Sequence, residues 1–403
     1  MSCLKKLRNL RTRVVPFLSE DEMSGYIYAD NAATTKLDID AFEAMKPYLL
    51  DDFGNASQPY FFSKRPKMAI KHARKTIAEC IGAEPEEIYF TSGGSESDNW
   101  AIKRFALFPT DIRHIITSNI EHHAVLNSVE TEREYSGADV FYLTVDGKGL
   151  VSPEELEKVL SRPREAVASC ESTLVSVMLA NNEIGTIQPI SELSAVAREY
   201  GARFHTDAVQ AVGHIPIDVK KLGVSMLSAS AHKFNGPKGI GFLYSSGSIP
   251  NLIDGGAQEK GARAGTENVA AIVGMAVALE KNCIEMKVNT EKILRLENLL
   301  ISRLNASGLD FIRNGTNQLP GNISLSFANA EGEMLLHRMD LKKICISTGS
   351  ACDSVNTQVS HVIKAIGVPE KYAKGTIRIS LGKNNSEEDV LTIADTLVRI
   401  LKG

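Results

Sequence analysis

Two kinds of hydrophobic pattern alternate along the chain from Tyr26 onward. Short runs of apolar, often β-branched residues are typical of buried strands, and longer stretches with an apolar residue every three or four positions are typical of helices with one buried face. Their alternation over about 250 residues predicts a mainly parallel sheet with helices on its faces. The predicted strands are Ile88–Thr91, His114–Thr117, Leu174–Met178, Arg203–Thr206, Met226–Ser228 and Gly241–Tyr244. The predicted helices are Ala41–Leu50, Met68–Ile81, Ser95–Phe108, Ala124–Tyr135, Ser191–Tyr200 and Thr266–Glu280.

The pattern changes beyond Lys281. A helix predicted over Thr290–Asn305 begins a segment of helical stretches and short strands. This change indicates a second, smaller α+β domain after the alternating region.

Residues 1–22 differ in charge from the rest of the chain. Five basic residues precede the first acidic one, Glu20: Lys5, Lys6, Arg8, Arg11 and Arg13. The apolar run Val14–Leu18 is interrupted by Pro16 and is too short for a secretory signal. We expect a disordered N-terminal extension, with an organellar transit peptide as the alternative. No aromatic residue stands between these charges, which disfavours a binding arm for nucleic acid or membrane.

Composition excludes several classes of protein. The 403 residues include 45 Lys+Arg and 49 Asp+Glu, a net charge of −4, and 43% are hydrophobic. A nucleic-acid-binding protein would carry a basic excess, and a disordered chain would be less apolar. No apolar run reaches the roughly 18 residues that a membrane span needs. We therefore expect a globular protein with no nucleic-acid or membrane partner.

The six cysteines do not predict a disulfide framework or a zinc site. They are scattered without a CxxC spacing or a secretory signal, at Cys3, Cys80, Cys170, Cys283, Cys345 and Cys352. This distribution favours a reducing compartment, and we expect a cytoplasmic protein that holds no metal.

A glycine-rich turn follows the first predicted strand. Gly93 and Gly94 separate this strand from a helix that we expect Ser95 to cap. Free backbone N–H groups and the helix dipole make such a turn a candidate phosphate site. An ordinary strand-to-helix turn with a serine cap is the alternative.

Two further candidates follow later predicted strands. Asp207 stands where doubly wound folds place ligand-binding groups, although it could equally be a helix N-cap. Lys233 follows His232 and precedes a Gly-Pro pair that ends the segment, a place where a lysine can be desolvated for Schiff-base formation. The alternative is a solvated loop lysine, which is what we expect of Lys238. A phosphate-binding turn, a carboxylate and a lysine together are what pyridoxal 5′-phosphate (PLP) requires: one group each for its phosphate, its ring nitrogen and its aldehyde.

Three more residues are candidates for chemistry. Cys352 lies among small polar residues, which indicates an exposed loop where a thiolate can reach a substrate. Arg378, on a predicted strand between two isoleucines, needs an anionic partner, either a substrate carboxylate or a structural acid. His122 and His123 are adjacent, so a shared metal is disfavoured, and one of them could stack on a flat cofactor.

Several motifs occur in a fixed order along nearly all of the chain past residue 25. They are Tyr28-Ala29-Asp30-Asn31-Ala32-Ala33-Thr34-Thr35, Asn181-Asn182-Glu183-Ile184-Gly185, Ala231-His232-Lys233, Arg263-Ala264-Gly265-Thr266-Glu267-Asn268 and Gly349-Ser350-Ala351-Cys352. In these motifs the chain resembles the NifS/IscS-type cysteine desulfurases, relatives of the class-V aminotransferases. The resemblance implies the α/β fold of the PLP-dependent transferases of fold type I. It implies a large PLP-binding domain over 38–285, with a mainly parallel seven-stranded sheet flanked by helices, and a small α+β domain from 24–37 and 286–403 that carries the cysteine loop.

The resemblance also implies roles for the candidate residues. Lys233 would bind PLP covalently, Asp207 would pair with the ring nitrogen, and His122 would stack on the ring and assist proton transfers. The remaining cofactor contacts would come from Gln210 at the phenolic oxygen and, around the phosphate, from Gly94, Ser95, Ser230, His232 and Thr266. Because Thr266 would reach the phosphate from a partner subunit, the resemblance implies a homodimer.

For the reaction, the resemblance implies that L-cysteine is converted to L-alanine. Asn31, Asn182 and Arg378 would hold the substrate carboxylate. Cys352 would attack the substrate sulfur and carry it as a persulfide to a sulfur-acceptor protein, for iron-sulfur cluster assembly, tRNA thiolation or another pathway. The alternatives are a selenocysteine lyase, another PLP-dependent lyase or aminotransferase, and a non-catalytic sulfur-relay or scaffold subunit.

This chain departs from the usual pattern of the family at a few positions. Asp353 directly follows Cys352, and a neighbouring carboxylate disfavours a thiolate. Lys383 stands where arginine is usual. Further departures fall at residues 56–60 and 357–359, so none touches the predicted cofactor contacts.

Overall fold

The computed structural model of the chain describes residues 25–105, 114–162, 173–349 and 359–403. Cys352 and the extension predicted over 1–22 lie outside the described residues.

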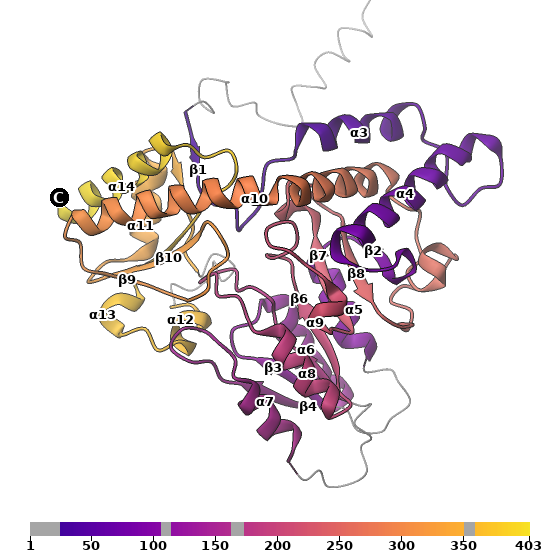
Figure 1. Cartoon of the computed structure of the whole chain (residues 1–403), viewed down its shortest axis with the longest axis horizontal. Helices are drawn as coiled ribbons and strands as arrows, with labels where there is room; N and C mark the ends of the chain where they lie inside the picture. Colours follow the sequence, from indigo (N-terminus) through magenta and orange to yellow (C-terminus); the bar gives the residue numbers. More distant parts are fainter. Residues whose placement is uncertain (1–24, 106–113, 163–172, 350–358) are drawn as a thin grey trace, which may run out of the picture.

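A seven-stranded sheet forms the centre of the larger part of the molecule, as Figure 1 shows. Its strands, in spatial order, are β2 (Ile88–Thr91), β8 (Gly241–Ser245), β7 (Met226–Ser230), β6 (Arg203–Asp207), β5 (Thr173–Ser176), β3 (His114–Ser118) and β4 (Asp139–Leu143). Only β8 runs antiparallel to its neighbours β2 and β7. The mainly parallel sheet is thus confirmed. The sequence prediction missed β4, an edge strand that stays partly exposed and lacks the apolar signature of the buried strands.

Helices cover the sheet and its edges. They are α3 (Ile39–Leu50), α4 (Lys64–Ile81), α5 (Gly94–Phe105), α6 (His123–Ser136), α7 (Pro153–Leu160), α8 (Ile190–Glu199) and α9 (Val219–Leu222). Glycines end two of these helices: Gly82 after α4 and Gly137 after α6 adopt left-handed conformations that glycine tolerates without strain.

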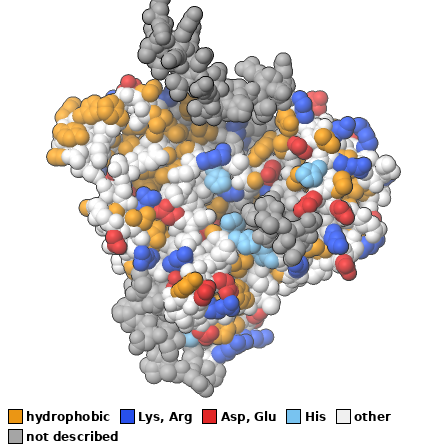
Figure 2. All heavy atoms as spheres, turned by 180° about the vertical axis from the view of Figure 1, so that it is seen from behind, with side chains coloured by type: hydrophobic (Ala, Val, Ile, Leu, Met, Phe, Trp, Pro, Cys, Tyr) orange, Lys and Arg blue, Asp and Glu red, His pale blue; other side chains and the backbone are white. Residues whose placement is uncertain are grey.

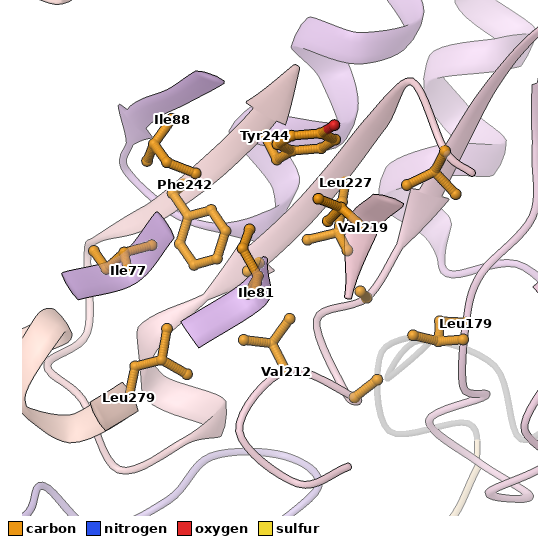
Figure 3. Packing of buried hydrophobic residues seen from close by; sticks show 14 of the residues in the cluster. Ile77, Ile81, Ile88, Leu179, Val212, Val219, Leu227, Phe242, Tyr244 and Leu279 are labelled. Atoms are coloured by element: carbon orange, nitrogen blue, oxygen red, sulfur yellow. The ribbon is translucent and has the colours of Figure 1, made fainter. Parts of the chain in front are cut away.

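The interior of this part is a large apolar cluster. Ile77 and Ile81, on the inner face of α4, lie against Phe242 of β8 (Figure 3). Leu279 joins the cluster from a further helix, α10 (Val269–Ala306). All four side chains are almost fully buried, and burial of each such side chain contributes about 1.5–3 kcal/mol. This packing fixes the carboxyl ends of the central strands in space.

A smaller part is built from the beginning and the end of the described chain. β1 (Ile27–Tyr28) pairs in parallel with β11 (Ile344–Cys345), and a second sheet has the order β12 (Thr376–Ser380), β10 (Asn322–Phe327) and β9 (Phe311–Arg313). Its helices are α11 (Gly332–Asp340), α12 (His361–Ala365), α13 (Glu370–Ala373) and α14 (Glu387–Lys402). The pairing of β1 with β11 brings residues just after 24 to this part of the molecule.

One helix, α10, runs through both parts. It extends from Val269 to Ala306 without interruption, whereas the sequence predicted two helices separated around Lys281. The prediction of a break was wrong because the polar residues after Lys281 include no proline or glycine, so they change the exposed face without ending the helix. Its first half packs into the large cluster and its second half into the cluster of the smaller part (Figure 1). The domain limits at 285 and 286 stay a prediction, and they fall inside this helix.

Candidate active site

A cavity of about 400 Å³ lies where the carboxyl ends of β6 and β7 face the smaller part of the molecule. Ten of the residues singled out in the sequence line it: Gly94, Ser95, His122, Asn182, Asp207, Gln210, Ser230, His232, Lys233 and Arg378. These residues come from six separate stretches of the chain, so the fold gathers them at one place, as doubly wound sheets do at their carboxyl edge.

The glycine turn forms one wall of this cavity. β2 ends at Thr91, Gly93 has φ 152°, and α5 begins at Gly94. A side chain at Gly94 would lie 2.6 Å from the Val209 side chain, so the close approach requires glycine. The expected serine cap was wrong, because Ser95 is already the second residue of α5. The N-terminus of α5, with its unpaired backbone N–H groups, therefore lies at the cavity wall, and Gly94 places no side chain there.

Asp207 is the last residue of β6, and Lys233 lies three residues beyond the end of the neighbouring strand β7. Lys233 Nζ donates to the Ala32 and Ala33 carbonyl oxygens at 2.6 and 2.8 Å, while Asp207 Oδ1 accepts from the Val209 N–H at 2.9 Å. Burial raises the pKa of Asp207, and the nearby His122 and Lys233 oppose this rise. Lys238, in contrast, is exposed, so the structure brings Lys233 rather than its neighbour to the cavity.

His122 and Gln210 line the same cavity as these two residues. His122 caps α6, with Nδ1 accepting from the Ala124 N–H at 3.1 Å, and burial lowers its pKa. Gln210 Nε2 donates to the Ala32 carbonyl oxygen at 3.0 Å. Both side chains are thereby held in fixed orientations, and His122 is a neutral imidazole at physiological pH.

Behind Asp207 the structure places two acidic residues that the sequence reasoning did not select. Asp98, one turn into α5, is fully buried and lines the cavity, and its Oδ1 has no hydrogen-bond partner among the described residues. Glu121 Oε1 accepts from the Ser118 hydroxyl and the Met178 N–H at 2.6 and 3.0 Å. Burial raises the pKa of Asp98 well above its usual value and that of Glu121 to about 8.

A buried histidine lies under this acidic group. His205 contacts the Ser176 and Ser228 hydroxyl oxygens at 2.9 Å each, and its Nε2 lies 3.7 Å from Asp98 Oδ1. Burial lowers its pKa to about 3, so His205 supplies no positive charge to Asp98. The signal that could have found Asp98 is its spacing of four from Gly94, which places both on one helix face.

Arg378 faces the opposite side of the cavity. Its Nη2 donates to Asp30 Oδ1 at 2.7 Å and its Nη1 to the Asn182 carbonyl oxygen at 3.0 Å. Of the two partners that the sequence left open, the structure shows a structural acid, Asp30. Asp30 belongs to the first of the sequence motifs, residues 28–35, but the sequence indicated no role for it in the site.

Two predicted site residues, Asn31 and Thr266, do not line this cavity. Asn31 donates to the Ser380 carbonyl oxygen at 2.8 Å and lines a separate small cavity of about 40 Å³. Thr266 is exposed and does not line the 400 Å³ cavity. Cys352 is not among the described residues, but the segment just before it, Ser347–Gly349, lines the cavity beside Arg378.

Metal-binding clusters and membrane-spanning helices are both absent from the described residues. No group of three or more His, Cys, Asp or Glu side chains in this part of the chain is arranged to hold a metal ion. Within the same ranges, no helix combines the length and apolar composition needed to cross a membrane.

Comparisons with known proteins agree with the geometry. The family model described as aminotransferase class-V matches residues 27–393. A cysteine desulfurase IscS of Dictyoglomus turgidum is 48% identical over 385 residues, which cover 94% of this chain and 95% of that protein. A solved structure of a NifS-like protein superposes with a TM-score of 0.85 at 37% identity, covering 94% of this chain and 100% of the other. A structure described as SspA in complex with cysteine gives a TM-score of 0.77 at 37% identity, covering 89% and 99%.

Proposed function

We propose, from the premise that the chain belongs to the aminotransferase class-V family, that it is a cysteine desulfurase. It would convert L-cysteine to L-alanine and hold the released sulfur as a persulfide on Cys352. The observation that carries the proposal is the gathering of Lys233, Asp207 and Arg378 around one cavity, because these side chains supply an amine, an anion and a carboxylate-binding cation. The relatives named cysteine desulfurase give the proposal its substrate.

The cofactor in this proposal is PLP, and the residues present fit it. The backbone at Gly93 and Gly94 offers N–H groups without side chains between them and the cavity, which suits a phosphate. Ser230 lies beside this turn, and His232 lines the same cavity. The buried Asp207 offers a carboxylate that a ring nitrogen could meet. When bound, PLP supplies an electron sink for the carbanion formed at the substrate α-carbon.

Each protein side chain then has a task that its contacts support. Lys233 Nζ is held by the Ala32 and Ala33 carbonyl oxygens at the mouth of the cavity and would bind the cofactor carbonyl carbon. His122, neutral because of its lowered pKa, can accept a proton over the ring. Arg378, with Asn182 beside it, would bind the substrate carboxylate.

The sulfur step belongs to Cys352. Its thiolate would form a bond to the sulfur of bound cysteine while the bond between this sulfur and the β-carbon breaks. A proton then completes the methyl group of alanine, and the sulfur stays on the protein as a persulfide. A sulfur-acceptor protein would take it from there.

A homodimer is the second part of the proposal. The end of α3 and the beginning of α4 expose an apolar surface, which we call the α3–α4 patch, visible at the upper left of Figure 2. It consists of Leu49, Leu50, Phe53, Tyr60, Phe61, Phe62 and Met68, with Phe61 85% exposed. Apolar surfaces of this kind mark protein interfaces, and a second copy of the chain would cover it. Thr266, exposed outside its own cavity, is then available to a partner's phosphate site.

The proposed location is the cytoplasm. A persulfide on Cys352 requires this thiol to be kept out of disulfides, which a reducing compartment ensures.

The test is to purify the protein with PLP, add L-cysteine, and measure alanine and protein-bound persulfide. We expect Cys352→Ser to lower alanine formation by at least about 100-fold and to abolish the persulfide. Cys345→Ser is the matched control: Cys345 lies in β11, burial raises the pKa of its thiol, and the variant should retain the wild-type rate.

Two outcomes would contradict this function. Full alanine formation by Cys352→Ser would show that another group takes the sulfur. A wild-type preference for selenocysteine that does not depend on Cys352 would instead identify a selenocysteine lyase.

A further inference from the structure

Glu96 places a negative charge in the first turn of α5, beside the backbone that forms the proposed phosphate site. It directly follows Ser95, which lines the cavity, and its Oε2 accepts the Ser92 N–H at 2.9 Å. A helix N-terminus attracts negative charge, so Glu96 competes for the same field that a phosphate would use. An unneutralised carboxylate at this place would also repel a phosphate that carries about two negative charges at pH 7–8.

Arg263 meets this carboxylate side-on. Its Nε donates to Glu96 Oε1 at 2.9 Å and its Nη2 to Oε2 at 3.3 Å. The two side chains are only 24% and 16% exposed, so solvent weakens their interaction less than it does on an open surface. Burial raises the pKa of Glu96, but the hydrogen bonds from Arg263 and Ser92 outweigh it and hold the pKa below its usual value.

The segment that carries Arg263 is itself anchored to the large part of the molecule. The Ala264 N–H donates to the Ile253 carbonyl oxygen at 3.0 Å. Earlier in the same segment, Glu259 forms a buried ion pair with Arg74, and its Oε2 accepts the Phe90 N–H at 2.9 Å. Arg263 is therefore held at Glu96 by backbone as well as by charge.

We propose that Arg263 is a positioning residue that neutralises Glu96 and thereby allows the N-terminus of α5 to accept a doubly negative phosphate. The inference rests on the proposed function, since the phosphate is that of PLP. It assigns a role to a motif residue that does not line the cavity. It also predicts that the effect of Arg263 is specific to the phosphate group rather than to the ring of the cofactor.

Pyridoxal, which has the same ring without the phosphate, allows this prediction to be tested. Full-length holoenzyme and variants are stripped of cofactor and titrated with PLP and with pyridoxal, while the absorbance of the lysine-bound cofactor is followed. We expect Arg263→Gln to weaken PLP binding by about 10- to 30-fold and pyridoxal binding by less than about 3-fold. Glu96→Gln alone should leave PLP binding unchanged or tighter.

The double variant separates neutralisation from direct contact. If Arg263 acts through Glu96, the variant Glu96→Gln with Arg263→Gln should bind PLP within about 3-fold of wild type, because the charge to be neutralised is gone. A double variant as weak as Arg263→Gln, or an equal loss for PLP and pyridoxal, would overturn the proposal.

Arg74→Gln is the matched control for loop displacement. It breaks the other buried ion pair of the same segment, so it should lower the melting temperature and affect PLP and pyridoxal equally. If it reproduced the phosphate-specific loss, displacement of the segment would explain the result and the proposal would fall. Failure of the wild type to bind PLP through Lys233 would instead reject the proposed function itself.

Discussion

At the sheet end of the cavity, Asp98, Glu121 and Asp207 bury three carboxyl groups whose pKa values burial raises. At the opposite end, the buried Arg378 forms an ion pair with Asp30 at 2.7 Å. The first end favours protonated acids, because these carboxyl groups are buried and most of them have no cation beside them. The second end favours fixed charges, because each charge has its counterion.

The comparison teaches which carboxyl can act as an anion. The Lys233 ammonium opposes the raised pKa of Asp207, whereas no cation opposes that of Asp98. Asp207 is thus the acid at the sheet end that has a cation beside it, and it is the one that the sequence selected. The other two acids supply polar packing around it.

The largest effect on the reaction rate is expected at the sheet end, from substitution of Asp207. Asp207→Asn removes the negative charge proposed to keep the cofactor ring nitrogen protonated, so alanine formation should fall by about 1,000-fold. Steady-state rates with L-cysteine measure it. The matched control is Asp98→Asn, which replaces a protonated acid by a neutral amide of the same shape and should change the rate by less than about 3-fold. Equal losses in both variants would show that the two acids are not distinguished by charge.

A smaller effect is expected at the arginine end. Arg378→Gln should raise the KM for L-cysteine by about 10- to 100-fold, because a charge-assisted hydrogen bond to the substrate carboxylate is lost. Asp30→Asn keeps the guanidinium but loosens its orientation, so its KM increase should be several-fold smaller. A fall in kcat at unchanged KM for Arg378→Gln would assign this arginine to chemistry instead of substrate binding.

The smallest effect concerns stability and its dependence on pH. In the unfolded chain Glu121 ionises near pH 4.3, whereas in the folded protein its pKa is about 8. Between these values only the folded state keeps the proton, so the contribution of Glu121 to stability decreases as the pH rises and becomes constant above about pH 8.

Glu121→Gln removes this dependence while still accepting from Ser118 and Met178. Relative to wild type, its melting temperature should therefore rise by a few degrees between pH 5 and pH 8, on the order of 2–4 °C. Differential scanning calorimetry at the two pH values measures this change, with Glu134→Gln on the exposed face of α6 as control. A difference that does not change with pH would show that Glu121 is ionised in the fold.

Much of the fold and the site followed from the sequence because the signals were local. Buried central strands are mostly apolar runs; Asp207 is the last residue of one, and Lys233 lies three residues beyond the end of the next. The edge strand β4 was missed because it is partly exposed and so lacks a continuous apolar run. The continuity of α10 was missed because its buried face changes partner midway, and the resulting change of pattern resembles the end of a helix. Asp98 and Glu121 escaped because, in the sequence alone, buried acids look like surface acids. The roles of Cys352 and Thr266 stay predictions.

The unbroken course of α10 has a mechanical consequence. At about 1.5 Å per residue, its 38 residues make a rod of roughly 57 Å, anchored at one end beneath the central sheet and at the other in the smaller part. Between Lys281 and Asn305 no proline or glycine offers a hinge, so tilting one part against the other would require the rod to bend. We expect its two ends to keep a constant separation as L-cysteine binds, and a pair of spin labels on its exposed face would report that distance. The two ends of the cavity would then have the same separation before and after the substrate binds.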